Sequence, residues 1–307
     1  MLDTGRQSGR PGCVVARAVA LFALALFSPV LFSLAGCGVT RTVSTKAMLP
    51  ILHGSLDEAY RDADLATVED GIPANLILIR GMCASNRGHR ELHQLAAQLY
   101  FSYALGFVED EDPTRAGLLY GEGLRLGRQR LEREGWFREA EGTPGGPTSA
   151  QLAKMGRDDV PLVFWTLANW GGWINQNLAE PAAIAQTPRV EAYLARVLEL
   201  EPDYFLGMPH VLAGSLKSFR PVMFGGDPEG GRKHFEEGMR ISGNRMLLFP
   251  VLYAQYYCRS VLDRDGFVTS LQGALDAPSD LLPEYRLFNE VAKAKAARLL
   301  ERTDEYF

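Results

Sequence analysis

The chain has 307 residues, of which 47% are hydrophobic and 22% are charged, and its formal net charge is −5. A chain of this length forms one large domain or two small ones. Nucleic acids select strongly basic surfaces, so the acidic balance argues against a nucleic-acid partner.

The first 36 residues have the organisation of a secretory signal peptide. Arg6, Arg10 and Arg17 precede an apolar run over residues 18–34, and small residues follow before Cys37. A basic segment, an apolar core and small residues before a cleavage site define such a signal. The run is 17 residues long, and an uncleaved membrane helix needs ~20. A cleaved signal is therefore the favoured interpretation.

The segment Leu-Ala-Gly-Cys at residues 34–37 resembles the lipobox of bacterial lipoproteins. In that class the peptidase cuts before the cysteine, and the thiol carries the lipid. We therefore predict a lipoprotein signal peptide over residues 1–36, lipid attachment at Cys37 and a lipidated tether over residues 37–50. A helical-repeat domain is expected over residues 51–307. The expected location is the periplasm, and Gly38 slightly favours the outer membrane.

Removal of the signal peptide leaves 271 residues. Three of the 32 basic residues and one of the 37 acidic residues lie within it, so the remainder carries a net charge of −7. Cys13 leaves with the signal and Cys37 is lipidated, so Cys83 and Cys258 remain. They could pair in an oxidising compartment. Both lie in apolar helical patterns, where a free cysteine acts as a small hydrophobe, so we slightly favour the unpaired state.

Helix start and stop signals recur along the whole chain. Ser55 and Glu58 have the spacing of a capping box; Gly71 is expected to end that helix and Pro73 to open the next. No segment shows sustained apolar and polar alternation between hairpin turns, so the predicted fold class is all-α, with about 11 helices. Further helices are expected near residues 89–107, 112–133, 159–178, 188–200, 205–219, 228–241, 245–262, 264–276 and 283–302.

A degenerate repeat runs through these helices. Three segments begin with a small or apolar residue, have a larger residue four positions later and end with a small or apolar residue three positions after that. Tetratricopeptide repeats have the same spacing. Antiparallel helix pairs stacked as degenerate tetratricopeptide-like repeats are therefore predicted, with an ordinary helical bundle as the alternative. The three segments begin at Ala116, Val190 and Gly231.

Two clusters of potential ligands give weak signals for metal. His89 and His93 share a helix face, but Arg90 replaces the glutamate of a metalloprotease motif, so we interpret them as a solvated helix start. The acidic residues 109–112 lack the spacing of a calcium loop and are interpreted as the start of a helix, where acids complement the dipole. No catalytic constellation is visible. We expect no enzymatic activity, no metal and no cofactor.

Residues 165–177 hold three of the four tryptophans. Indoles beside amide side chains suit a pocket for an apolar ligand with a polar head. The alternative is a core in which the tryptophans fill space and the amides bond to helix ends. The candidate ligand-pocket residues are Trp165, Asn169, Trp170, Trp173, Asn175 and Asn177.

Four segments taken together resemble the T component of TRAP transporters, the tripartite ATP-independent periplasmic systems. They are residues 103–112, 170–175, 188–204 and 220–228, and Trp-Gly-Gly-Trp-Ile-Asn at 170–175 is the most specific. The resemblance covers about residues 45–302.

This resemblance implies a periplasmic lipoprotein that is an accessory of a solute transport system. It implies the periplasmic solute-binding protein of the same system as a partner, and self-association, as a trimer that encloses a pore. No enzymatic activity comes with the family. The alternative is an envelope helical-repeat scaffold lipoprotein with a different protein partner. A lipid-anchored hydrolase is a weaker third possibility.

Overall fold

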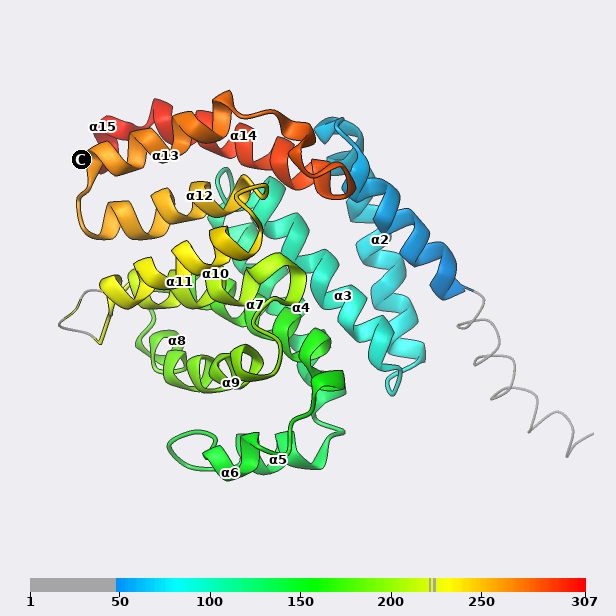
Figure 1. Ribbon diagram of the computed structural model, residues 1–307. Helices are drawn as coiled ribbons and strands as arrows, with labels where there is room; N and C mark the ends of the chain where they lie inside the picture. The colour runs from blue at the N-terminus through cyan, green and yellow to red at the C-terminus, as the bar shows by residue number, and fades with distance from the viewer. Residues whose placement is uncertain (1–47, 221, 223–224) are drawn as a thin grey trace, which may run out of the picture. The chain divides into compact units, whose positions relative to one another are not determined.

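The computed structural model describes residues 48–220, 222 and 225–307. The predicted signal peptide, Cys37 and most of the predicted tether lie outside the described residues. Residues His53–Phe307 form one compact unit. All regular structure in the described part of the chain is helical (Figure 1), which confirms the all-α class. In that part, no helix is long and apolar enough to cross a membrane.

The helices exceed the predicted number because several are single turns. Two π-helical segments, η1 (Ala104–Val108) and η4 (Tyr253–Cys258), extend the helices before them. Besides the helical residues 48–61, the described part of the chain has fourteen α-helices: α2 (Leu65–Ser85), α3 (Arg90–Tyr103), α4 (Pro113–Leu131), α5 (Gly135–Glu141), α6 (Ser149–Leu152), α7 (Val160–Gln176), α8 (Pro181–Ile184), α9 (Thr187–Leu200), α10 (Tyr204–Ser218), α11 (Pro228–Ile241), α12 (Leu248–Leu252), α13 (Arg264–Asp276), α14 (Arg286–Glu301) and α15 (Thr303–Tyr306).

Most predicted helix boundaries agree with the structure to within three residues, and side-chain caps form at two of them. Asp112 Oδ1 accepts from the Arg115 amide at 2.9 Å, and Asp227 Oδ1 accepts from the Gly230 amide at 2.9 Å. In each case proline follows the cap at the first helical position, where its missing N–H group has no helical partner to lose.

The prediction for the first two helices was wrong. Residues 53–61 lie within a helix, so Ser55 caps nothing. Asp64 instead accepts from the amides of Ala66 and Thr67, and α2 then continues through Gly71 and Pro73. The buried face of α2 carries Val68, Ile72, Leu76, Ile79 and Cys83 at three- and four-residue spacing. Burial of this continuous apolar stripe outweighs the local signal of the proline.

His93 also differs from its interpretation as part of a solvated helix start. Its side chain is fully buried, and its Nδ1 lies 2.9 Å from the carbonyl oxygen of His89. Burial lowers the pKa of His93 below its usual value, which favours the neutral ring. Cys83 and Cys258 are free and buried, as predicted.

Glycines bring helix axes close at two crossings. A Cβ added at Gly123 in α4 would lie 2.2 Å from Asn169 Oδ1 in α7, and one at Gly238 in α11 would lie 2.9 Å from Val211 Cγ2 in α10. Both glycines belong to the predicted repeat segments. The close crossings of these pairs are present, while the tetratricopeptide repeat type stays a prediction.

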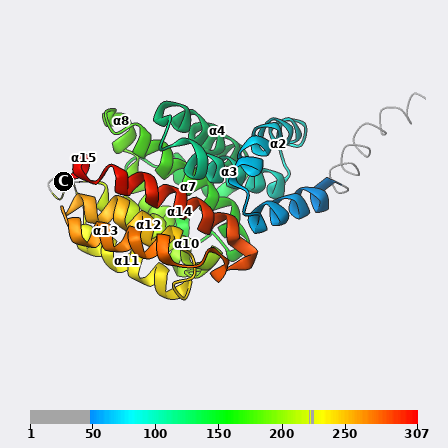
Figure 2. The same ribbon diagram turned by 90° about the horizontal axis from the view of Figure 1, so that it is seen from above.

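Successive helices lie beside one another, and α14, near the end of the chain, returns to α2. α13 and α14 run side by side in both views (Figures 1 and 2). α14 packs against η1 and also touches α2. This return places residues of α14 opposite the segment that follows η1, and the charged cavity described below is built there.

Candidate ligand cavity and the charged cavity beside it

An apolar cavity of about 50 Å³ lies between α7, α10 and η4. One face of α7 lines it with Phe164, Ala168, Gly171, Gly172 and Asn175. A water molecule needs ~10–15 Å³ of such space, so the cavity as it stands holds a few waters. A larger ligand requires lining side chains to rotate. α10 and the residue that follows it supply side chains of this kind, namely Met208, Leu212, Leu216 and Phe219.

The glycine pair of α7 sets the distance to the neighbouring helices. A Cβ at Gly172 would lie 2.8 Å from the ring of Tyr120 in α4, and one at Gly171 would lie 3.2 Å from Leu212 in α10. Any larger residue at Gly172 would displace that ring. The pair therefore lets α7 approach α4 and α10 closely. The apolar cavity lies where this close contact between the helices ends.

A second, charged cavity of about 450 Å³ adjoins the first at Asn175, which lines both. Its volume falls in the range of sites for small molecules. Three guanidinium groups line it, from Arg259, Arg298 and Arg302. Carboxylates of Glu109, Asp110 and Glu301 line it too.

A buried ion cluster forms the wall of the charged cavity. Lys295 is fully buried, and its Nζ lies 2.8 Å from Glu109 Oε1 and 2.6 Å from Asp110 Oδ1. Tyr120 donates to Glu109 Oε2 at 2.6 Å, and Arg298 donates to Asp110 Oδ2 at 3.0 Å. Burial opposes the charge of Lys295, but the two carboxylates outweigh it and hold the lysine pKa above its usual value.

The two π-helical segments deliver several of these side chains. η1 ends directly before Glu109 and Asp110; η4 carries Gln255 and is followed by Arg259. A π-helical turn is rare and frequently occurs at a functional site, since the extra residue turns later side chains to a new direction. Both segments therefore mark this part of the fold as a candidate site.

Arg259 is the cation with the greatest capacity for a ligand. Its guanidinium carbon lies 3.8 Å from the ring centre of Tyr306, and no carboxylate of the described residues pairs with it. Stacking on an aromatic ring holds a guanidinium in place and leaves its edge free to donate. The arrangement suits the polar head of a ligand whose apolar part enters the neighbouring cavity.

The structure places the predicted tryptophan and asparagine residues on different sides of α7. Trp165 is buried and donates to the Tyr204 hydroxyl at 3.1 Å. Asn169 is buried against α3 and α4, and donates to the carbonyl oxygens of Ala97 and Trp165. These two side chains serve the helix packing and line neither cavity.

The other four residues are also divided between the packing and the cavities. Trp170 is buried and donates to Gln186 at 2.7 Å. Trp173 faces Gly121 of α4, and Asn177 donates to the Trp173 carbonyl oxygen at 2.7 Å. Asn175 alone among the six lines the cavities.

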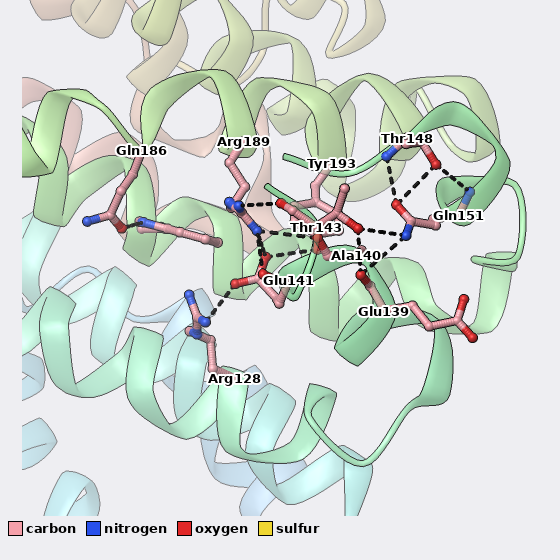
Figure 3. A network of polar contacts seen from close by, with 11 residues as sticks. Arg128, Glu139, Ala140, Glu141, Thr143, Thr148, Gln151, Gln186, Arg189 and Tyr193 are labelled. Atoms are coloured by element: carbon pink, nitrogen blue, oxygen red, sulfur yellow. Dashed lines mark hydrogen bonds and ion pairs between the residues drawn. The ribbon is translucent and has the colours of Figure 1, made fainter. Parts of the chain in front are cut away.

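A polar network fixes the segment that contains α5 and α6 (Figure 3). Glu141 accepts from Arg128 at 2.6 Å, from Arg189 at 3.0 Å and from the Tyr193 hydroxyl at 3.0 Å. The guanidinium carbon of Arg128 also lies 4.9 Å from the ring centre of Trp170. The network therefore links α5 to α4 and α9, which explains the buried position of Trp170 without a ligand.

The ion cluster is the feature that the sequence-based interpretation missed. Glu109 and Asp110 were assigned to a helix start, yet they face Lys295, more than 180 residues later in the chain. The sequence contained one signal for this buried pairing. Lys295 lies on the apolar face of α14 with Val291, Ala292 and Leu299, and a lysine on such a face requires a buried partner.

The comparisons with known proteins agree with the resemblance seen in the sequence. Residues 61–307 match the family described as TRAP transporter T-component. An uncharacterized protein of Treponema pallidum (strain Nichols) is 25% identical over 305 residues, which cover 89% of this chain and 94% of that protein. Because the family match covers most of the residues, this chain belongs to the TRAP transporter T-component family.

Proposed function

We propose that this chain is a periplasmic lipoprotein accessory of a TRAP-type solute transport system. In this role it binds the solute-binding protein of the same system and a small apolar or amphipathic ligand. Family membership supports the transport role. The observation that carries the ligand proposal is the pair of adjoining cavities, one apolar and one charged, which meet at Asn175.

The ligand is expected to place its apolar part against α7 and α10 and its polar end toward the charged cavity. The lining of the apolar cavity has few polar groups, so an aliphatic chain that enters it buries apolar surface and covers few hydrogen-bonding groups of the protein. Asn175 donates to the Tyr256 hydroxyl at 3.4 Å, a long contact that a ligand oxygen can replace. Opening requires rotation of α10 side chains, because the present volume admits only water-sized groups.

Decanoate is a suitable probe, with tryptophan fluorescence as the measurement. The Trp165 ring lies 5.0 Å from Phe164 and 5.8 Å from Phe101, both of which line the apolar cavity. Binding should therefore change the emission. Ser215→Leu fills the cavity and should abolish the response, and Asn175→Leu should weaken it several-fold.

Asn177→Leu is the matched control. Asn177 lies two residues from Asn175 but lines neither cavity, so its response should equal that of the wild type. An undiminished response in Ser215→Leu would place the probe elsewhere and overturn the ligand proposal.

Titration calorimetry with the purified solute-binding protein of the same system tests the partner proposal. A saturable complex is expected, and an unrelated periplasmic solute-binding protein should produce no heat. Light scattering on the purified chain tests self-association, for which we expect the mass of a trimer. If no complex forms with the cognate solute-binding protein, the partner proposal is wrong, and the alternative of a scaffold lipoprotein with a different protein partner is favoured.

A further inference from the structure

α10 and α11 cross so closely that side chains beside the crossing are held in fixed positions. A Cβ added at Gly214 would lie 2.7 Å from the ring of Phe235, and one at Gly238 would lie 3.3 Å from the carbonyl oxygen of Gly207. The same added Cβ would lie 3.6 Å from His210 Cβ. His210 therefore projects from α10 directly beside α11.

His234 meets His210 at this crossing. It precedes Gly238 by four residues, which places it on the same face of α11 one turn earlier. The two Nδ1 atoms lie 3.1 Å apart, and the ring centres are 5.2 Å apart with an angle of 43° between the planes. Both side chains are half-buried. Burial lowers the pKa of each imidazole, which favours the neutral form of both rings.

Two neutral imidazoles whose Nδ1 atoms face each other have two stable arrangements. In the first, one ring carries its proton on Nδ1 and donates it to the other Nδ1. In the second, both rings carry the proton on Nε2, and both Nδ1 lone pairs bind one cation. Metal–nitrogen bonds of about 2.0–2.1 Å across this separation subtend roughly 95–100° at the ion, within the range of borderline metals.

We propose that His210 and His234 form a two-histidine chelate for a borderline divalent transition-metal ion such as Zn²⁺ or Cu²⁺. The exchange moves one proton from Nδ1 to Nε2 through solvent and releases none, because both rings start and end neutral. The described residues provide no group of three or more His, Cys, Asp or Glu ligands. Solvent therefore completes the coordination, and the bound ion exchanges readily.

Calorimetric titration of the full chain in detergent with ZnCl₂, after dialysis against EDTA and then buffer, tests the proposal. We expect one ion per chain for the wild type. His210→Gln and His234→Gln should each weaken binding at least tenfold, since a single imidazole remains. His53→Gln is the matched control, because His53 is a half-exposed histidine paired with Glu91. It should bind as the wild type does.

Electron paramagnetic resonance with one equivalent of Cu²⁺ gives a second measurement on the folded wild type. The spectrum is expected to show nitrogen couplings from two imidazoles. Separately, thermal unfolding of each histidine variant checks that the variant is folded. Couplings from fewer than two imidazoles, or a Zn²⁺ affinity equal to that of the wild type in both His210→Gln and His234→Gln, would overturn the chelate. Neither result depends on the transport role, since no transported solute or partner protein is present.

Discussion

Lys295 is a fully buried cation, and its ion-pair partners among the described residues, Glu109 and Asp110, are far away in the chain. The desolvation of a buried ion pair is costly, but removal of one partner is costlier, since the other charges stay buried without compensation. Glu109 and Asp110 have side chains that are only 4% and 16% exposed. Without the lysine, Asp110 would keep Arg298 and Glu109 would keep the Tyr120 hydroxyl, but Glu109 would lose its ion pair.

Lys295→Met should therefore lower the free energy of unfolding by about 3–5 kcal/mol. Methionine retains the apolar part of the lysine side chain, so the loss of unfolding free energy measures the effect of removing the charge. Chemical denaturation measures it, and Arg264→Gln is the control. Arg264 also pairs with an acid, Asp304, but both side chains are more than half exposed. That change should cost less than ~1 kcal/mol. Equal losses in the two variants would contradict the role of burial.

The same substitution predicts a pH dependence. The folded-state pKa of Lys295 is raised, so its contribution is fully present below the unfolded pKa of about 10.4. The contribution is lost only as the pH rises through the folded value. The difference between wild type and Lys295→Met should stay constant from about pH 6 to 9 and decline in strong alkali. A difference that disappeared near pH 7 would exclude this assignment.

At the scale of elements, the helix crossings depend on particular glycines. Gly123→Ala should lower the free energy of unfolding by ~1–3 kcal/mol through overpacking, since its Cβ would meet the buried Asn169. Gly273 in α13 has no atom within 4 Å of an added Cβ. Gly273→Ala should stabilise the chain by about 0.5–1 kcal/mol, because alanine favours the helix. A thermal scan of both variants decides, and changes of the same sign would contradict close packing at Gly123.

α7 explains why the cavity-lining residues were only partly predictable. Most of its residues are buried, on more than one side. A 3.6-residue period identifies a buried face only when the opposite face is polar. The sequence therefore indicated that residues 165–177 were a candidate ligand pocket. It did not indicate which side chains line the cavity, namely Phe164, Ala168 and Asn175, or that Asn169 packs against Gly123 instead. Of the six named residues, Asn175 alone lines the two cavities, and ligand binding at Asn175 stays a prediction.

The helix boundaries were predictable where a cap and a proline agree, as at Asp112 and Asp227. They were not predictable in α2, where Pro73 and the apolar stripe give opposite signals and tertiary burial decides. The pairing of Lys295 with Glu109 and Asp110 is nonlocal, so no window of sequence contains both partners. Sequence patterns thus gave the all-α class and most elements, while the charged cavity required the fold.

At the scale of the whole molecule, the proposed lipoprotein is held at a membrane by its lipid. In the described part of the chain no helix can span one. The proposed anchor is the lipid at Cys37, which lies outside the described residues. Acyl chains bind a membrane through ~0.8 kcal/mol per buried CH₂ group, so removal of the lipid should remove this contribution.

Cys37→Ala should therefore move the protein from the membrane fraction to the soluble fraction of the envelope without unfolding the helical body. Expression in a bacterial host followed by fractionation and immunoblotting measures this, and circular dichroism of the released protein checks its helices. Cys83→Ala is the matched control, because Cys83 is free and buried and should leave attachment unchanged. A Cys37→Ala protein that is cleaved yet stays in the membrane fraction would show that attachment comes from another part of the chain.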